Sequence, residues 1–242
     1  MIIVKLEGWS VRADELANVR GLQLFRDMDD ARFADLMRAA FLQTFPPHVQ
    51  LIQEGDRPDF LFIVTEGCAE LFAAWNDHEV TMMMVEPGGT FILAAVLKDA
   101  VHLMSARTAV RSRILMIPAE AVRDAFERDD AFSRSIVLEL ADCFRGVVKA
   151  HKDLKLRSGV ERLAARLLQY DNEHGATGRF SLPHDKRTLA ALLGMTPENL
   201  SRAFATLRPY GVETDGPDVV LSSVTDLQRL AKPNPLIDDK AM

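Results

Sequence analysis

The sequence predicts an α+β chain in which a small β-barrel or roll, a long helix and a pair of short helices with a hairpin follow one another. Three patterns lead to this prediction. Short apolar runs alternate with turn residues from 48 to 118, an amphipathic pattern of helical period fills 119–156, and two short helical patterns joined by a glycine turn occupy 185–208. With 242 residues, the chain is long enough for two modest domains, each with its own hydrophobic core.

The first expected element is helical and covers residues 14–42, interrupted by the acidic turn Asp27–Asp30. After the turn, apolar residues recur at helical spacing, at Phe33, Leu36, Met37 and Ala40. The pair Pro46-Pro47 ends the pattern because proline has no backbone donor and clashes with the preceding turn of a helix. The first residues of the chain contain early acidic side chains and no long apolar stretch, so we expect no secretory signal.

Five short strands are expected between 48 and 118, at 49–52, 60–64, 69–73, 80–85 and 113–117. Turn residues such as Glu54-Gly55-Asp56 and Pro87-Gly88-Gly89 follow them. Glycine suits these positions because it adopts positive φ without strain. Strands of this length and spacing indicate a small antiparallel barrel or roll.

The region 119–156 contains a long amphipathic helix with the three/four spacing of a coiled-coil seam. The predicted seam consists of Ile136, Leu140, Cys143 and Val147, continued at Leu154 and widened by Phe144 and Val148. We expect this seam to join two copies of the chain; the alternative is a helix packed on its own domain. Ser158-Gly159-Val160-Glu161 has the spacing of a capping box, so another helix starts there. These limits predict domains at 1–128, 129–156 and 157–242.

The segment 185–208 has the pattern of a helix-turn-helix. Gly194-Met195-Thr196 forms the turn, Thr196 is a good N-cap, and Pro197 suits the first helical position. In the second helix, Leu200, Phe204 and Leu207 face inward, which leaves a polar outward set: Glu198, Asn199, Ser201, Arg202 and Ala205. Residues 212–221 then predict a β-hairpin, a wing able to touch a DNA backbone.

Three outward side chains suit the reading of bases. Glu198, Ser201 and Arg202 lie at i, i+3 and i+4 near the helix start, where a recognition helix reaches base edges. Arginine can donate two hydrogen bonds to guanine, glutamate can accept one from cytosine, and serine can do either. The alternative is a surface ion pair between Glu198 and Arg202, worth only tenths of a kcal/mol. Thr196 and Asn199 complete the predicted double-stranded DNA contacts.

Charge and composition narrow the function classes further. The net charge is −6, but residues 155–213 hold nine Lys and Arg against six Asp and Glu, so the helix-turn-helix segment is locally basic. The longest apolar run, Phe91–Leu97, is too short to cross a membrane. Two cysteines, Cys68 and Cys143, are too few for a disulfide framework, so we expect a reducing, cytoplasmic setting.

The order of motifs resembles one family over about residues 20–230. Glu54-Gly55-Asp56, Leu61–Val64 and Glu66-Gly67 resemble a cyclic-nucleotide-binding β-roll, and the long helix and winged helix-turn-helix follow as in the cyclic-AMP receptor protein / fumarate-nitrate regulator (Crp/Fnr) superfamily. The resemblance implies a homodimeric transcription regulator with an effector-sensing β-roll, a dimerisation helix, and DNA and RNA polymerase as partners. Glu198, Ser201 and Arg202 match the Glu-x-x-Ser-Arg of the fumarate-nitrate regulator branch, which implies palindromes with TTGAT-like half-sites.

The effector site departs from the cyclic-AMP pattern. Where that pattern has Phe-Ile-Gly-Glu, this chain has Phe91-Ile92-Leu93-Ala94, and Met104 replaces the arginine before Ser105-Ala106. Without that carboxylate and guanidinium, the charge-assisted bonds to a cyclic nucleotide are lost, so we expect no cyclic AMP. The residues predicted to form an apolar effector pocket are Phe91, Leu93, Ala94, Leu103, Met104 and Ser105. No N-terminal cysteine cluster is present, so no iron–sulfur cluster is expected.

What remains resembles the nitric-oxide-responsive Dnr/NnrR branch, which implies haem as a cofactor and control of denitrification or nitric-oxide-handling genes. His102 and His151 are the candidate haem ligands. The same architecture sensing a small organic ligand, or working without an effector, stays open. A cupin-like β-barrel enzyme is the alternative of another class. It is disfavoured because no His-x-His ligand pattern is present.

Overall fold

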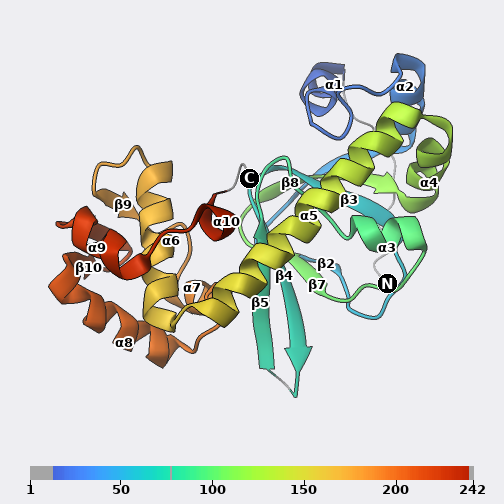
Figure 1. The fold of residues 1–242 in the computed structure, drawn as a ribbon. Helices are drawn as coiled ribbons and strands as arrows, with labels where there is room; N and C mark the ends of the chain where they lie inside the picture. Colours follow the sequence, from blue (N-terminus) through green and yellow to red (C-terminus); the bar gives the residue numbers. More distant parts are fainter. Residues whose placement is uncertain (1–12, 77, 240–242) are drawn as a thin grey trace. The chain divides into compact units, whose positions relative to one another are not determined.

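The computed structural model describes residues 13–76 and 78–239, and the chain divides after Cys143 into two compact units (Figure 1). The expectation about a secretory signal concerns residues that lie outside the described ones. Within the described residues, no helix is both long and apolar enough to cross a membrane. The fold class expected from the sequence is confirmed: an N-terminal β-roll, a long helix and a C-terminal helix-turn-helix domain with a hairpin.

The first unit is a roll of two antiparallel four-stranded sheets with helices packed on it. The sheet orders are β1-β8-β3-β6 and β2-β7-β4-β5. Its elements are α1 (Ala13–Arg20), α2 (Asp30–Ala39), β1 (Phe41–Phe45), β2 (Gln50–Ile52), β3 (Phe60–Glu66), β4 (Ala69–Trp75), β5 (His78–Val85), β6 (Thr90–Phe91), α3 (Leu93–Lys98), β7 (Ser105–Thr108), β8 (Ser112–Pro118), α4 (Ala119–Arg128) and the start of α5 (Asp130–Leu156).

Four elements of this unit differ from the sequence prediction. Residues 41 and 42 belong to strand β1 instead of a helix, because Phe41 pairs with Met116 and Leu42 with Leu115 of β8. Strands β6 and β7 and the short helix α3 were not predicted. Each is only two to six residues long, and the two strands are defined by pairing with distant segments.

Two hydrophobic cores stabilise the first unit. One lies between the helices and the sheet of β8 and β3, and α5 contributes the fully buried Phe132 and Ile136 to it. The other fills the roll interior and includes Phe62, Phe91 and Ile114. The rings of Phe62 and Phe91 stack there at a centroid distance of 5.3 Å. Burial of a large apolar side chain is worth about 1.5–3 kcal/mol, so both cores fix the roll firmly.

Gly67 sits where only glycine fits. Its φ is +83°, and a Cβ there would lie 2.5 Å from Ser112 Oγ and 2.6 Å from the Arg111 carbonyl oxygen. We expect Gly67→Ala to lower the free energy of unfolding by about 2–4 kcal/mol, through left-handed strain plus a clash with backbone. Urea unfolding measures this. Gly88→Ala is the control, because Gly88 has φ +90° but nothing within 4 Å of its added Cβ. Equal losses for the two variants would contradict the clash.

The second unit packs helices on a small antiparallel sheet of order β10-β11-β9. Its elements after α5 are α6 (Gly159–Glu173), β9 (Arg179–Ser181), α7 (Lys186–Leu192), α8 (Pro197–Leu207), a 3-10 turn (Arg208–Tyr210), β10 (Val212–Asp215), β11 (Asp218–Leu221), α9 (Val224–Ala231) and α10 (Pro235–Asp238). The predicted capping box is present, with Ser158 and Glu161 bonded to each other's backbone amides at the start of α6. The buried faces of α6, α7 and α8 form one core.

Candidate nucleic-acid interface

Helices α7 and α8 form the predicted helix-turn-helix. The Asp185 carboxylate accepts from the Thr188 amide (2.7 Å) and so caps α7. Gly194 in the turn has φ +61°, and a Cβ there would lie 2.5 Å from Leu154 Cδ2. Thr196 Oγ1 accepts from the Asn199 amide (3.3 Å), and Pro197 follows as the first residue of α8. The turn glycine, the N-cap and the first-turn proline predicted from the sequence therefore all occupy their expected positions in this motif.

Helix α8 has one buried and one exposed face. Leu200, Phe204 and Leu207 are buried in the core of the second unit. The outward side chains expected from the helical period are all exposed: Thr196, Glu198, Asn199, Ser201, Arg202 and Ala205. The structure therefore brings together the predicted DNA-contacting residues on one solvent-facing surface at the start of α8.

Arg202 is oriented by Asn199. Its Nη2 donates to Asn199 Oδ1 at 2.6 Å, and the described residues contain no ion pair between Arg202 and Glu198. The Glu198 pKa is lowered by the Thr196 hydroxyl first, then by its own backbone amide and the charge of Arg202. Glu198 is therefore an ionised acceptor and Arg202 a donor with an exposed fork. The surface ion pair considered as an alternative is not formed.

A groove of about 530 Å³ borders this surface and separates α8 from the hairpin of β10 and β11. Its lining residues are Lys186, Pro197, Leu200, Ser201, Phe204, Ala205, Arg208, Val212, Glu213 and Thr214. The hairpin itself carries Glu213, Asp215 and Asp218, all exposed. The hairpin is therefore formed as predicted. Its three carboxylates repel phosphate, however, so its charge disfavours contact with a DNA backbone.

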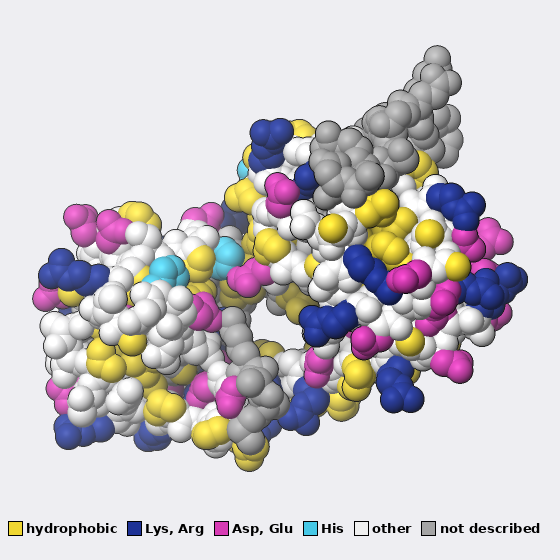
Figure 2. Space-filling model, turned by 90° about the horizontal axis from the view of Figure 1, so that it is seen from above, with side chains coloured by type: hydrophobic (Ala, Val, Ile, Leu, Met, Phe, Trp, Pro, Cys, Tyr) yellow, Lys and Arg dark blue, Asp and Glu magenta, His cyan; other side chains and the backbone are white. Residues whose placement is uncertain are grey.

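Charge on the rest of the surface is mixed. In the face shown in Figure 2, basic and acidic side chains are interspersed over both units, and neither sign covers the face. The local excess of Lys and Arg in the helix-turn-helix segment thus provides no broad basic field on this side. Recognition would depend on the few side chains that α8 presents.

The predicted seam of α5 is partly wrong. Ile136 is 0% exposed because it packs inside the core of its own unit, and Leu140 is half-buried against the same core. Cys143 and Val147 are exposed as expected. Among the large exposed apolar residues of α5 are Val137 (57%), Phe144 (69%) and Val147 (63%), and only Val147 belongs to the predicted seam itself. The available apolar stripe of α5 is therefore centred on Phe144 and Val147.

The predicted effector-pocket residues do not converge. Phe91 and Met104 pack in the roll interior, whereas Leu93 packs in the core beneath the helices. Ala94 is exposed and Leu103 is 80% exposed. The Ser105 hydroxyl accepts from the Glu54 amide at 3.0 Å. The expected pocket is therefore not formed by Leu93, Ala94 and Leu103, because Leu93 is buried from helix α3 into the core beneath the helices while Ala94 and Leu103 face solvent.

Of the two candidate haem ligands, only His102 is buried. Its side chain is 4% exposed and its Nδ1 has no hydrogen-bond partner, whereas His151 is exposed on α5. A buried imidazole nitrogen with no hydrogen-bond partner could serve as a ligand to the iron of haem. His102 is the one predicted residue that suits haem, since the residues of the predicted apolar pocket are divided between two cores and the surface. No cluster of three metal-binding side chains occurs within residues 13–76 and 78–239.

Burial of His102 makes the first unit sensitive to acid. Burial lowers the pKa of His102 below its ordinary value of 6.5, despite nearby Asp56 and Asp59. The unfolded chain therefore binds a proton at pH values where the folded chain does not, and stability falls as the pH drops below 6.5. We expect the unfolding free energy of wild type to fall more between pH 7.5 and 5.5 than that of His102→Gln. The control His78→Gln should behave like wild type, and an unchanged pH dependence in His102→Gln would contradict the prediction.

Comparison with known proteins identifies two domains. The model of the cyclic nucleotide-binding domain matches residues 42–129, and that of the Crp-like helix-turn-helix domain matches residues 161–232. No curated protein matches the chain. The two domain matches have the same order as the β-roll and the helix-turn-helix described above.

Solved structures share the fold. A protein of Eubacterium rectale described as a transcriptional regulator of the Crp/Fnr family has a TM-score of 0.71 at 16% identity, covering 87% of this chain and 98% of its own. FixK2 from Bradyrhizobium japonicum has a TM-score of 0.68 at 20% identity, covering 81% and 98%. A CooA mutant from Carboxydothermus hydrogenoformans has a TM-score of 0.65 at 19% identity, covering 80% and 88%. At these identities the likeness concerns the fold alone.

Proposed function

This chain has the architecture of a Crp/Fnr-type transcription regulator and not that of an enzyme, and we propose that it binds palindromic DNA as a homodimer. One observation carries the proposal. Glu198, Ser201 and Arg202 are exposed together near the N-terminus of α8, the second helix of a helix-turn-helix. This is the part of a recognition helix that meets base edges in the major groove.

The chemistry of these three side chains suits a TTGAT-like half-site. The exposed guanidinium of Arg202 can donate two hydrogen bonds to the O6 and N7 of guanine. The ionised Glu198 can accept a hydrogen bond from the amino group of the cytosine paired with a guanine. Ser201 adapts to either role. The match to the fumarate-nitrate regulator branch supports the same half-site.

The exposed apolar side chains of α5 support a two-fold dimer. Phe144 and Val147 are large, apolar and exposed at i, i+3, which is the a/d spacing of a two-helix seam. We propose that the α5 helices of two copies pack against each other through these side chains. The operator is then an inverted repeat whose half-sites lie about one helical turn apart. RNA polymerase is the proposed protein partner of the bound dimer.

The proposal is tested by fluorescence anisotropy with labelled DNA. An inverted repeat of TTGAT should bind at least about 1,000-fold more tightly than a scrambled duplex at 150 mM salt. Sedimentation should give a mass of two chains. A dimer with equal affinity for both duplexes would overturn the proposed specificity, and a monomer that binds neither would overturn the whole proposal.

A second proposal concerns the effector. The buried, unpartnered Nδ1 of His102 favours haem, and the resemblance to the Dnr/NnrR branch favours nitric oxide as its signal and denitrification or nitric-oxide-handling genes as its targets. Haem would supply an iron that discriminates nitric oxide from other small neutral molecules. His102 would hold it. Ala94 and Met104 leave no charged group for a cyclic phosphate, so cyclic AMP is not part of the proposal.

Haem titration followed by absorbance separates the alternatives. A stoichiometric Soret band that shifts in His102→Gln, but not in His151→Gln, supports haem on His102. Nitric oxide should then change operator affinity, because a ligand shifts an equilibrium only by its differential affinity for the two states. If wild type binds no haem, the effector is a small organic ligand or none.

A further inference from the structure

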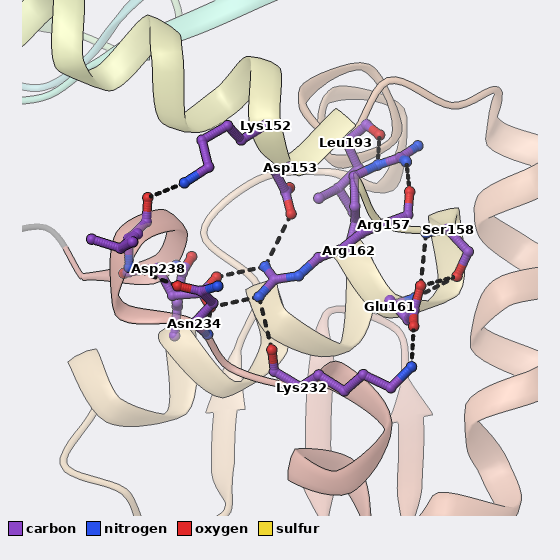
Figure 3. Close-up of polar contacts among 12 residues, drawn as sticks. Lys152, Asp153, Arg157, Ser158, Glu161, Arg162, Leu193, Lys232, Asn234 and Asp238 are labelled. Atoms are coloured by element: carbon purple, nitrogen blue, oxygen red, sulfur yellow. Dashed lines mark hydrogen bonds and ion pairs between the residues drawn. The ribbon is translucent and has the colours of Figure 1, made fainter. Parts of the chain in front are cut away.

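The residues that follow the matched helix-turn-helix domain form a strap. Asn234–Asp239, which includes α10, lies against the last turns of α5 and against α6 (Figure 3). We call these six residues the C-terminal strap. All the contacts described below lie inside the second unit.

Arg157 is the centre of the attachment. Its Nη1 and Nη2 donate to the two carboxylate oxygens of Asp238 at 2.6 and 2.7 Å. The same guanidinium donates to Asp153 Oδ1 (3.0 Å) and to the Lys232 carbonyl oxygen (3.2 Å). The Arg157 side chain is only 7% exposed. A bidentate pair shielded from water is among the stronger polar contacts a protein makes.

Further bonds hold the strap along its length. They are Lys149 Nζ to the Asp239 carbonyl (2.5 Å), Lys152 Nζ to the Leu236 carbonyl (3.3 Å) and Gln169 Nε2 to the Asp238 carbonyl (3.2 Å). The strap thus bonds to the last two turns of α5 and to the second half of α6. It bridges both helices on either side of the junction between them.

The junction itself is short. Helix α5 ends at Leu156 and α6 begins at Gly159, so only two residues connect them. The Arg162 guanidinium of α6 also holds the junction, because it donates to the Arg157 carbonyl (2.7 Å) and to the Leu193 carbonyl (2.8 Å). Lys232, next to the strap, pairs with Glu161 at 3.0 Å. Because the strap bonds to Lys152 of α5 and to Gln169 of α6, bending between these helices would disturb the Arg157–Asp238 pair.

We propose that the C-terminal strap fixes the angle between α5 and α6 and thereby sets the half-site spacing that the dimer accepts. This inference rests on the proposed function, in which α5 joins the two copies and α8 reads DNA. A fixed junction holds the two recognition helices at one separation. A junction without its strap would let them follow half-sites at several separations.

A spacing series tests this inference. Operators are made with the half-sites at the optimal distance and with one or two base pairs inserted or removed. One base pair turns a half-site by about 35° around the DNA axis, so wild type should lose about tenfold or more in affinity at each altered spacing. Asp238→Asn keeps the shape of the strap and removes the charge that pairs with Arg157. We expect it to reduce the spacing penalty to about threefold or less, with affinity at the optimal spacing little changed.

Asp226→Asn is the matched control, because it removes one carboxylate from the same unit at a site paired with Arg229. It should keep the full spacing penalty. Lys152→Gln, which loses one bond to the strap, should give an intermediate penalty even if Asp238→Asn unfolds. Unchanged penalties in folded Asp238→Asn and Lys152→Gln would overturn the inference. If wild type binds no operator of the series, the proposed function falls and this inference with it.

Discussion

Arg202→Ala is expected to lose about 1–3 kcal/mol of operator binding at each half-site, and therefore about twice that in a dimer. Arg202 is exposed at the start of α8 and its guanidinium is oriented by Asn199 at 2.6 Å, so a fork is presented to the major groove with little further ordering. Truncation leaves the O6 and N7 of guanine without donors. The affinity for a TTGAT repeat should fall, and discrimination at the guanine position should fall with it.

Anisotropy titrations with all four base pairs at that position measure both effects. Arg229→Ala is the control, because it removes the same charge from an exposed side chain of α9, in the same unit but outside α8. The control should lower the affinity for specific and scrambled DNA equally and slightly. If Arg202→Ala also weakens both duplexes to the same extent, Arg202 contacts phosphate and does not read a base.

Replacing both Phe144 and Val147 by lysine is expected to give folded monomers that bind the operator about 10²–10⁴-fold more weakly than wild type. The two side chains are 69% and 63% exposed, so their loss leaves the core of each chain intact. Charges facing each other across a helix seam prevent pairing. A monomer keeps one half-site and loses the high effective concentration of the second.

Sedimentation at several concentrations and operator titration test this prediction together. Asp142→Lys, on the opposite side of α5, is the control and should remain a dimer. A dimeric Phe144→Lys, Val147→Lys protein would show that another surface joins the copies. Ile136→Lys would be uninformative for pairing, because a charge at this fully buried position destabilises the first unit itself.

The helix-turn-helix could be predicted closely because its signals are local. Asp185, Gly194, Thr196 and Pro197 each act on their own turn of backbone, and the 3.6-residue period alone determines which side chains of α8 face outward. The strands β1 and β7 could not be predicted in this way. They are stabilised by partners such as Met116 and Phe72, which are distant in sequence.

The seam and the pocket failed for a related reason. Helix α5 carries apolar residues both in its own core, such as Ile136, and on its exposed surface, such as Phe144, and periodicity alone cannot separate the two sets. The pocket residues lie in two short segments of the sequence, but the structure distributes them over two cores and the surface. The strap is the largest omission, since nothing in the sequence links Arg157 to a carboxylate 81 residues away.

The buried and exposed apolar residues of α5 also determine what happens when the protein is scarce. Because Phe132 and Ile136 are buried within one chain, the start of α5 is anchored before any second copy arrives. If two copies pair through α5 as proposed, each chain would fold before pairing, and dilution would separate the pair without unfolding it. At low copy number the cell would hold intact single chains that each occupy half-sites only briefly. Promoter occupancy would therefore rise with the square of protein abundance, which makes synthesis of the chain itself a steep control on its targets.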